Sequence, residues 1–94
     1  MAVRAVSSPE ELESLLAEHQ VLGFVAQACG PCLQQRPIWD ALPETVLVVD
    51  VDAMPDVRAR YAVEALPSTV VRGQLLRGVQ TTRQLQEALG APVA

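Results

Sequence analysis

The sequence contains no lysine and no asparagine, so its seven basic residues are all arginines, and they stand against eleven carboxylates. The formal net charge is therefore -4. A protein that binds nucleic acid needs a basic stripe that neutralises phosphates. Because this chain has none, we expect no nucleic acid among its partners.

Long hydrophobic runs are also missing. No stretch approaches the ~18 consecutive apolar residues of a membrane-spanning helix, so the sequence predicts no membrane partner. Residues 1–16 include Arg4 and then Glu10 and Glu11, without an unbroken apolar segment of signal-peptide length. We therefore expect the protein to work in the cytoplasm.

Aromatic residues are scarce, with one Phe, one Trp and one Tyr, yet 50% of the residues are hydrophobic and only 19% are charged. This composition is far from the profile of a disordered chain and predicts a packed core. A length of 94 residues leaves no room for a second core when a domain takes about 100 to 200 residues. The prediction is a single domain over residues 1–94.

Hydrophobic periodicity and capping residues predict the order strand, helix, strand, helix, strand, helix, strand, strand, helix. These elements are expected at residues 3–6, 9–18, 21–26, 31–42, 45–51, 55–61, 67–71, 75–79 and 81–89. Residues 46–49 are apolar on both faces, so their strand is expected to be central. The predicted fold class is α/β: a mixed sheet, parallel in its first part, ends in an antiparallel hairpin and carries helices on both faces.

The helix over residues 31–42 contains several candidates for core contacts. Leu33, Ile38 and Leu42 are expected to face the core, and Pro37 is expected to kink the helix. Trp39 is interpreted as a packing residue rather than a platform for substrate, because helical spacing places it beside Ile38 and Leu42.

The only two cysteines lie three positions apart, in the motif Cys29-Gly30-Pro31-Cys32, between a predicted buried strand and a predicted helix. The positive end of the helix dipole is expected to lower the pKa of Cys29, which makes its thiolate a nucleophile. Cys32 lies one turn into the helix, where it can resolve a mixed disulfide. Gly30 lets a substrate chain approach, and Pro31 begins the helix without wasting a donor.

Other interpretations of the two thiols remain open. A structural zinc site needs about four ligands, and the only histidine, His19, is distant in the predicted layout. Cu(I), or a metal shared across a dimer, would need fewer ligands from this chain. The pair could also be inert and buried. Redox chemistry is the favoured interpretation, with no metal and no organic cofactor. Asp50 and Asp52, at a predicted strand end, are interpreted as caps and turn residues rather than as a metal-binding or acid–base pair.

Several landmarks together resemble the thioredoxin family over essentially the whole chain. The motif at residues 29–32 is the active-site sequence of that family, and Pro37 matches its helix-kinking proline. Residues 61–68 resemble the segment that leads into the family's cis-proline. Gly73 and Gly78 resemble the glycines of its final hairpin.

The resemblance implies a thioredoxin fold and the reduction of disulfides in protein substrates by Cys29 and Cys32. Electrons would come from a flavoprotein partner similar to thioredoxin reductase. The Leu66-Pro67 bond would be cis, and its backbone would pair with an extended substrate chain beside Gly30 and Pro31. The alternative is a peptide-binding or adaptor module that keeps this fold and leaves the dithiol idle.

Three positions depart from the family pattern. Ala28 stands where the family has tryptophan, Gly23 where it has a buried aspartate, and Val48 where it has a lysine. In the family the aspartate and the lysine are thought to manage the proton of the resolving cysteine. Their loss predicts slow resolution by Cys32 at neutral pH. Gly23→Asp is expected to restore part of the rate if the backbone has room for a side chain there, which a glycine chosen for close packing would not leave.

Overall fold

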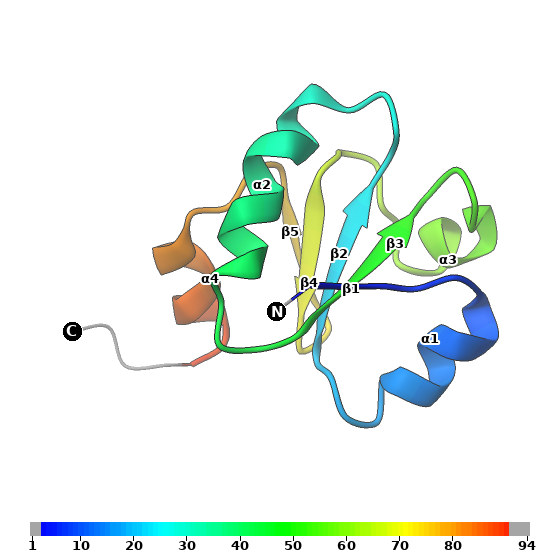
Figure 1. Cartoon of the computed structure of the whole chain (residues 1–94), viewed down its shortest axis with the longest axis horizontal. Helices are drawn as coiled ribbons and strands as arrows, with labels where there is room; N and C mark the ends of the chain where they lie inside the picture. The colour runs from blue at the N-terminus through cyan, green and yellow to red at the C-terminus, as the bar shows by residue number, and fades with distance from the viewer. Residues whose placement is uncertain (1–2, 91–94) are drawn as a thin grey trace.

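The structure is a computed structural model and describes residues 3–90. Each element predicted from the sequence is present, with ends that differ by up to three residues. In chain order they are β1 (Val3–Ala5), α1 (Pro9–Leu15), β2 (Val21–Val25), α2 (Gly30–Asp40), β3 (Val46–Asp50), α3 (Pro55–Arg60), β4 (Ser68–Val71), β5 (Gln74–Arg77) and α4 (Thr82–Ala88). Figure 1 shows their arrangement around the sheet.

The five strands form one mixed sheet in the order β1-β3-β2-β4-β5. Strands β1, β3 and β2 run parallel, whereas β4 is antiparallel to both β2 and β5. The predicted α/β class, with a parallel part and a final hairpin, is therefore confirmed. The strand expected to be central, β3, is interior with a neighbour on each side, but the middle position belongs to β2. β2 has no polar side chain and β3 has one only at its last residue, Asp50, so apolar composition does not separate the two positions.

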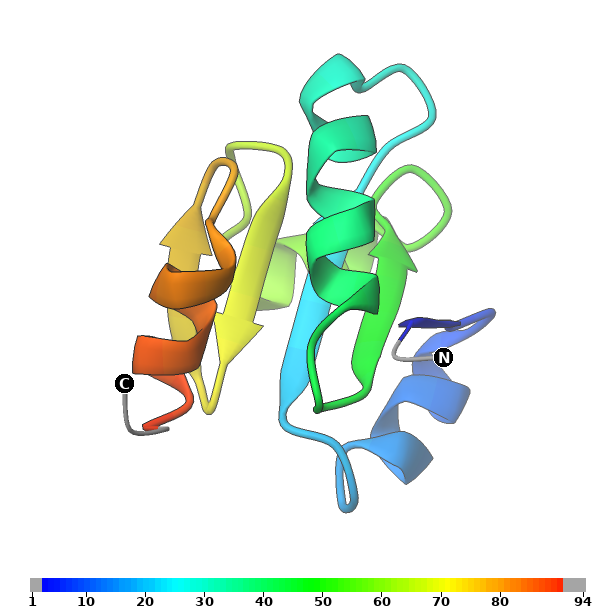
Figure 2. The same cartoon turned by 60° about the vertical axis from the view of Figure 1, so that its left-hand side comes forward.

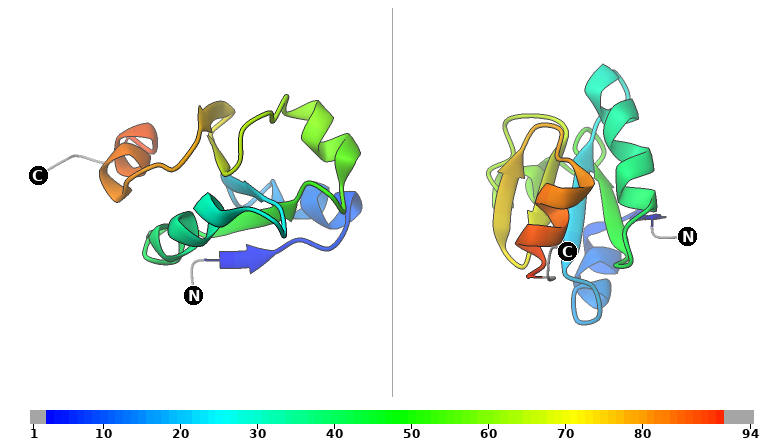
Figure 3. Two further views of the ribbon diagram at one scale, coloured as in Figure 1. Left: turned by 90° about the horizontal axis from the view of Figure 1, so that it is seen from above. Right: turned by 90° about the vertical axis from the view of Figure 1, so that its left-hand side faces the viewer.

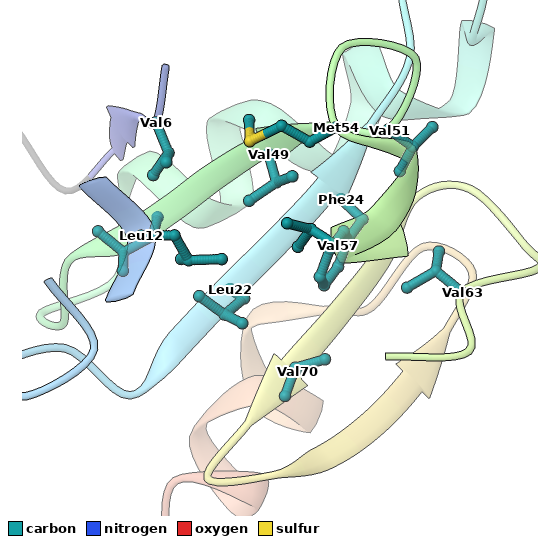
Figure 4. Close-up of a cluster of buried hydrophobic side chains, with 11 residues drawn as sticks. Val6, Leu12, Leu22, Phe24, Val49, Val51, Met54, Val57, Val63 and Val70 are labelled. Atoms are coloured by element: carbon teal, nitrogen blue, oxygen red, sulfur yellow. The ribbon is translucent and has the colours of Figure 1, made fainter. Parts of the chain in front are cut away.

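Helices cover both faces of the sheet, as expected (Figures 2 and 3). Helices α1 and α3 pack on one face, where Leu12, Phe24 and Val57 belong to one buried cluster (Figure 4). On the other face α2 and α4 enclose a second cluster, which includes Trp39 and Leu85. Residues of β2 alternate between the two clusters because successive side chains of a strand point to opposite faces.

Local sequence accounts for where the helices begin. The Ser8 hydroxyl accepts a hydrogen bond from the Glu11 N–H, and Pro9 occupies the first turn of α1. Thr81 and Gln84 form a reciprocal capping box at α4. Helix α1 ends at Leu15, three residues earlier than predicted, because residues 16–18 continue as a turn.

The prediction that Leu33 faces the core is wrong, since its side chain is 72% exposed. The buried residues of α2 are Cys32, Gln35 and Trp39, which follow the spacing of one helix face. Leu33 is the next residue after Cys32, and one step along a helix turns a side chain by about 100°. It therefore lies on the solvent side.

The hairpin between β4 and β5 turns through Arg72 and Gly73, whose φ angles are +50° and +84°. Two successive positive φ angles match the right-handed twist of the flanking strands. Glycine adopts this conformation without steric cost, whereas arginine does so at some cost. Among residues 3–90, no helix combines the length and the apolar character needed to cross a bilayer.

Candidate active site

Cys29 and Cys32 are joined by a disulfide at the entrance of α2, and their Cα atoms are 5.4 Å apart. Strand β2 is buried along its whole length and delivers the chain to this point through residues 26–28. Cys29 is the N-cap residue of the helix, with an extended backbone at φ -132° and ψ 98°. The predicted strand, loop and helix therefore bring the two sulfurs into bonding contact.

The two cysteines differ in exposure. Cys32 is 2% exposed and belongs to the cluster on the α2 face, whereas Cys29 is half-buried. Gly30 and Pro31 between them are exposed, and a Cβ added to Gly30 would meet no atom within 4 Å. The surface beside Cys29 is thus open to an approaching chain, while Cys32 is enclosed in the core.

The Leu66-Pro67 peptide bond is cis, as the resemblance implied. Pairing of Phe24 with Ser68 places the preceding residue, Pro67, beside the carboxyl end of β2. The dithiol loop leaves the sheet from that same end. Leu66 and Cys29 both pack against the cluster on the α2 face. The dithiol loop and the Leu66-Pro67 segment, which are both predicted to contact the substrate, therefore lie at the same end of the sheet.

The backbone around Gly23 is closely packed. Gly23 lies between Val48 on β3 and Thr69 on β4, and the ring of Trp39 covers it. The Trp39 indole Nε1–H donates to Thr69 Oγ1 at 3.0 Å, and both residues are fully buried. The aromatic ring thus occupies the space that a side chain at position 23 would need.

The condition for Gly23→Asp to restore the resolving step, room for a side chain at position 23, is therefore not met. A Cβ on Gly23 would lie 2.6 Å from Cη2 and 2.8 Å from both Cζ2 and Cζ3 of Trp39. Real Cβ atoms essentially never approach other heavy atoms so closely. The ring is held by its hydrogen bond to Thr69, so aspartate would first have to displace a buried tryptophan.

Sequence reasoning missed the buried Gln35. Its side chain is fully enclosed and makes two hydrogen bonds to the backbone of Gln80, which lies 45 positions away in the sequence. A polar residue on the inward face of α2, three positions after Cys32, was the available signal. The identity of its partner had no signal, because nothing local links the two positions.

The other residues considered from the sequence are Asp50, Asp52 and His19. Asp50 Oδ1 accepts from the Asp52 N–H at 2.9 Å, which confirms the interpretation as a turn cap. His19 is half-buried and lines a hollow of about 560 Å³ with Tyr61 and Arg72. That hollow begins at the start of β2, the end opposite the dithiol, so its size does not mark the redox site. Within residues 3–90, no three His, Cys, Asp or Glu side chains gather into a group that could hold a metal ion.

Comparisons with known proteins agree with this geometry. A family model described as Thioredoxin matches residues 4–90. A thioredoxin of Chlamydia trachomatis is 30% identical over 74 residues, which cover 73% of this chain and 72% of that protein. Thioredoxin-2 of Pyricularia oryzae is 36% identical over 75 residues, which cover 72% of this chain and 44% of that protein.

Solved structures extend the similarity to the fold. The X-ray structure of Fasciola hepatica thioredoxin superimposes with a TM-score of 0.76 and 27% identity, over 95% of this chain and 99% of that one. The solution structure of the oxidised thioredoxin from Plasmodium falciparum gives a TM-score of 0.74 at 22% identity, over 94% and 95% of the two chains. The five-stranded mixed sheet with its four helices is the fold of these proteins.

Proposed function

Since the chain belongs to the thioredoxin family and is a thiol-disulfide oxidoreductase, we propose that it reduces disulfides in protein substrates with Cys29 as nucleophile and Cys32 as resolving thiol. The observation that carries this assignment is the unequal exposure of the two sulfurs. Cys29 is half-buried at the start of α2, whereas Cys32 is 2% exposed. A substrate disulfide reaches the first sulfur and not the second.

The first step follows from the position of Cys29. In the reduced protein its sulfur lies at a helix N-terminus, where unpaired N–H groups and the helix dipole favour the thiolate. This thiolate attacks one sulfur of the substrate disulfide. The S–S bond of the substrate breaks, one substrate thiolate leaves, and a mixed disulfide between Cys29 and the substrate forms.

The second step regenerates the disulfide that the structure holds. The Cys32 thiol loses its proton and its thiolate attacks the Cys29 sulfur. The mixed disulfide breaks, the second substrate thiolate leaves, and the Cys29–Cys32 bond forms. Two electrons have passed from the dithiol to the substrate. A reductase similar to thioredoxin reductase returns them, and we place this cycle in the cytoplasm, where thiols are kept reduced.

The surface around the dithiol supports a protein as the substrate. Leu33 and Val79 are the large apolar side chains that stand exposed among the described residues. Leu33 directly follows Cys32, and Val79 directly follows Gly78, whose N–H donates to the Pro67 carbonyl at 2.9 Å. Each of the two segments of the site therefore has an exposed apolar side chain close to it, which a substrate chain can contact. An extended chain between them would meet the Leu66-Pro67 backbone.

The adaptor alternative is not favoured, because the two sulfurs are bonded and one of them is accessible. Reduction of insulin separates the two functions. The protein, with dithiothreitol as electron donor, should precipitate the insulin B chain at a rate far above that of dithiothreitol alone. The double variant with both cysteines changed to serine should fall to that background. Equal rates for the protein and the double variant would favour the adaptor.

A further inference from the structure

Gln35 carries a primary amide into an otherwise apolar helix face. Its side chain is fully buried, between Cys32 one turn earlier and Trp39 one turn later on α2. Burial of an amide is unfavourable unless its donor and its acceptor both find partners. A leucine or a methionine would fill this position without that requirement. The partner of Gln35 therefore shows what the amide contributes.

That partner is the backbone of Gln80, in the loop between β5 and α4. The Gln35 Nε2–H donates to the Gln80 carbonyl at 3.0 Å, and the Gln80 N–H donates to Gln35 Oε1 at 2.6 Å. The two bonds match donor to acceptor and acceptor to donor. A two-point contact of this kind fixes orientation as well as distance.

The same loop also contacts Pro67, in the segment that is proposed to bind the substrate chain. Two residues before Gln80, the Gly78 N–H donates to the Pro67 carbonyl at 2.9 Å. Gly78 has a φ of +81°, a conformation that glycine adopts freely. The Gln80 side chain closes the loop by donating from Nε2 to the Arg77 carbonyl at 2.9 Å.

These contacts form one continuous connection from the resolving cysteine to the proline. It runs from Cys32 along one helical turn to Gln35, then to Gln80, and through Gly78 to Pro67. Helix α2 and the Leu66-Pro67 segment reach the site from different parts of the chain. The loop joins them on the α2 face, in addition to the pairing of β2 with β4.

We propose that Gln35 is a positioning residue, which holds the helix that carries the dithiol in register with the Leu66-Pro67 segment and so presents a protein disulfide to Cys29. The proposal rests on the proposed function, in which that segment binds the substrate chain. A small disulfide has no chain to place along Pro67. Gln35 should therefore matter for protein disulfides and little for small ones.

Gln35→Met tests this inference, because methionine keeps the approximate volume and removes both hydrogen bonds. Gln34→Met is the matched control, since Gln34 is the exposed neighbour on the same helix. Each pre-reduced protein is mixed with insulin or with 2-hydroxyethyl disulfide, quenched with iodoacetamide and analysed by mass spectrometry. The insulin rate of Gln35→Met should fall on the order of tenfold to a hundredfold, as expected for a misplaced reacting group. The small-disulfide rate should remain close to that of the unmodified protein.

Amide hydrogen exchange gives a second readout that does not depend on activity. In Gln35→Met the Gly78 and Gln80 N–H groups should exchange faster, while amides of β2 keep their protection. Unchanged protection of Gly78 would overturn the inference, because the loop would then hold Pro67 without Gln35. An equal fall in both rates would also overturn it, since general destabilisation would explain the loss.

The kinetic experiment also separates this inference from the proposed function. If the unmodified protein reacted no faster with insulin than with 2-hydroxyethyl disulfide, the Leu66-Pro67 segment would not select protein substrates. The inference would then fail before any substitution at position 35, because the protein would have no preference for Gln35 to set. The proposed function itself fails only if the protein reduces insulin no faster than the variant with both cysteines changed to serine. If the unmodified protein prefers insulin and Gln35→Met keeps that preference, only the inference fails.

Discussion

Trp39 lies directly over Gly23, so that a Cβ built on the glycine would come within 2.6 Å of the indole ring. The ring cannot simply turn aside, because its Nε1–H donates to Thr69 Oγ1 and the whole side chain is buried. A glycine on a central strand and a tryptophan on the active-site helix are therefore complementary in shape. Neither position tolerates a change of volume without a response from the other.

Gly23→Ala should destabilise the protein by about 1 to 3 kcal/mol, because a methyl group would overpack this contact. Denaturant unfolding measures the loss. Gly23→Ala combined with Trp39→Leu should cost less than the sum of the two single changes, since the smaller side chain makes room for the methyl group. Simple additivity of the two free energies, or a stable Gly23→Ala protein, would contradict this account.

Thr69→Val should cost about 1 to 3 kcal/mol, because it leaves the buried indole N–H without an acceptor while it keeps the side-chain shape. Thr69→Ser is the control, since serine retains the hydroxyl oxygen. Adding Trp39→Phe to Thr69→Val removes the unpaired donor as well, so the cost of the valine should be smaller in that background. The free energies of unfolding of Thr69→Val, Thr69→Ser, Trp39→Phe and the double variant test this expectation.

Cys29→Ser and Cys32→Ser should block different steps of the exchange reaction. Cys29→Ser removes the accessible nucleophile and should abolish exchange with protein disulfides. Cys32→Ser keeps the attack and removes the second step, so a mixed disulfide with the substrate should accumulate on Cys29. Mass spectrometry of the quenched reactions identifies the modified residue. A substrate adduct on Cys32 in the Cys29→Ser protein would reverse the assignment.

Most of the fold could be predicted from the sequence, because the capping and turn signals at Ser8, Thr81 and Gly73 are local. The order of the strands came from the resemblance, since period-two patterns carry no information about neighbours. Leu33 was misplaced because a short helix with few apolar residues leaves its rotational phase undetermined.

The dithiol is contiguous in sequence and was found for that reason. What surrounds it is not contiguous. The bonds between Gln35 and Gln80 join positions that are 45 residues apart, and the bond between Trp39 and Thr69 spans 30 residues. The contact of Gly23 with Trp39 depends on how a helix seats on a sheet. Composition and residue spacing predict neither long-range hydrogen bonds nor the way in which a helix packs on a sheet.

Cys32 must lose its proton before it can resolve the mixed disulfide. In the reduced protein, burial of this residue among apolar side chains is expected to raise the pKa of its thiol, because the charged form loses its solvation. The row of the sheet through Gly23 consists of Ala5, Val48, Gly23, Thr69 and Leu76, none of which is ionisable. No side chain of that row can accept the proton.

The attack by Cys29 should therefore be fast at neutral pH, and the resolving step should be slow. Resolution needs the Cys32 thiolate, so its rate should rise about tenfold for each pH unit below the pKa of that thiol and level off above it. Stopped-flow mixing with insulin measures both steps across pH. The carboxylate to test is Asp50, which pairs with Val25 at the end of β3. A fast, pH-independent second step that becomes slow in Asp50→Asn would show that this carboxylate takes the proton. The same fast step in Asp50→Asn would leave water as the acceptor, and the predicted dependence on pH would be wrong in both cases.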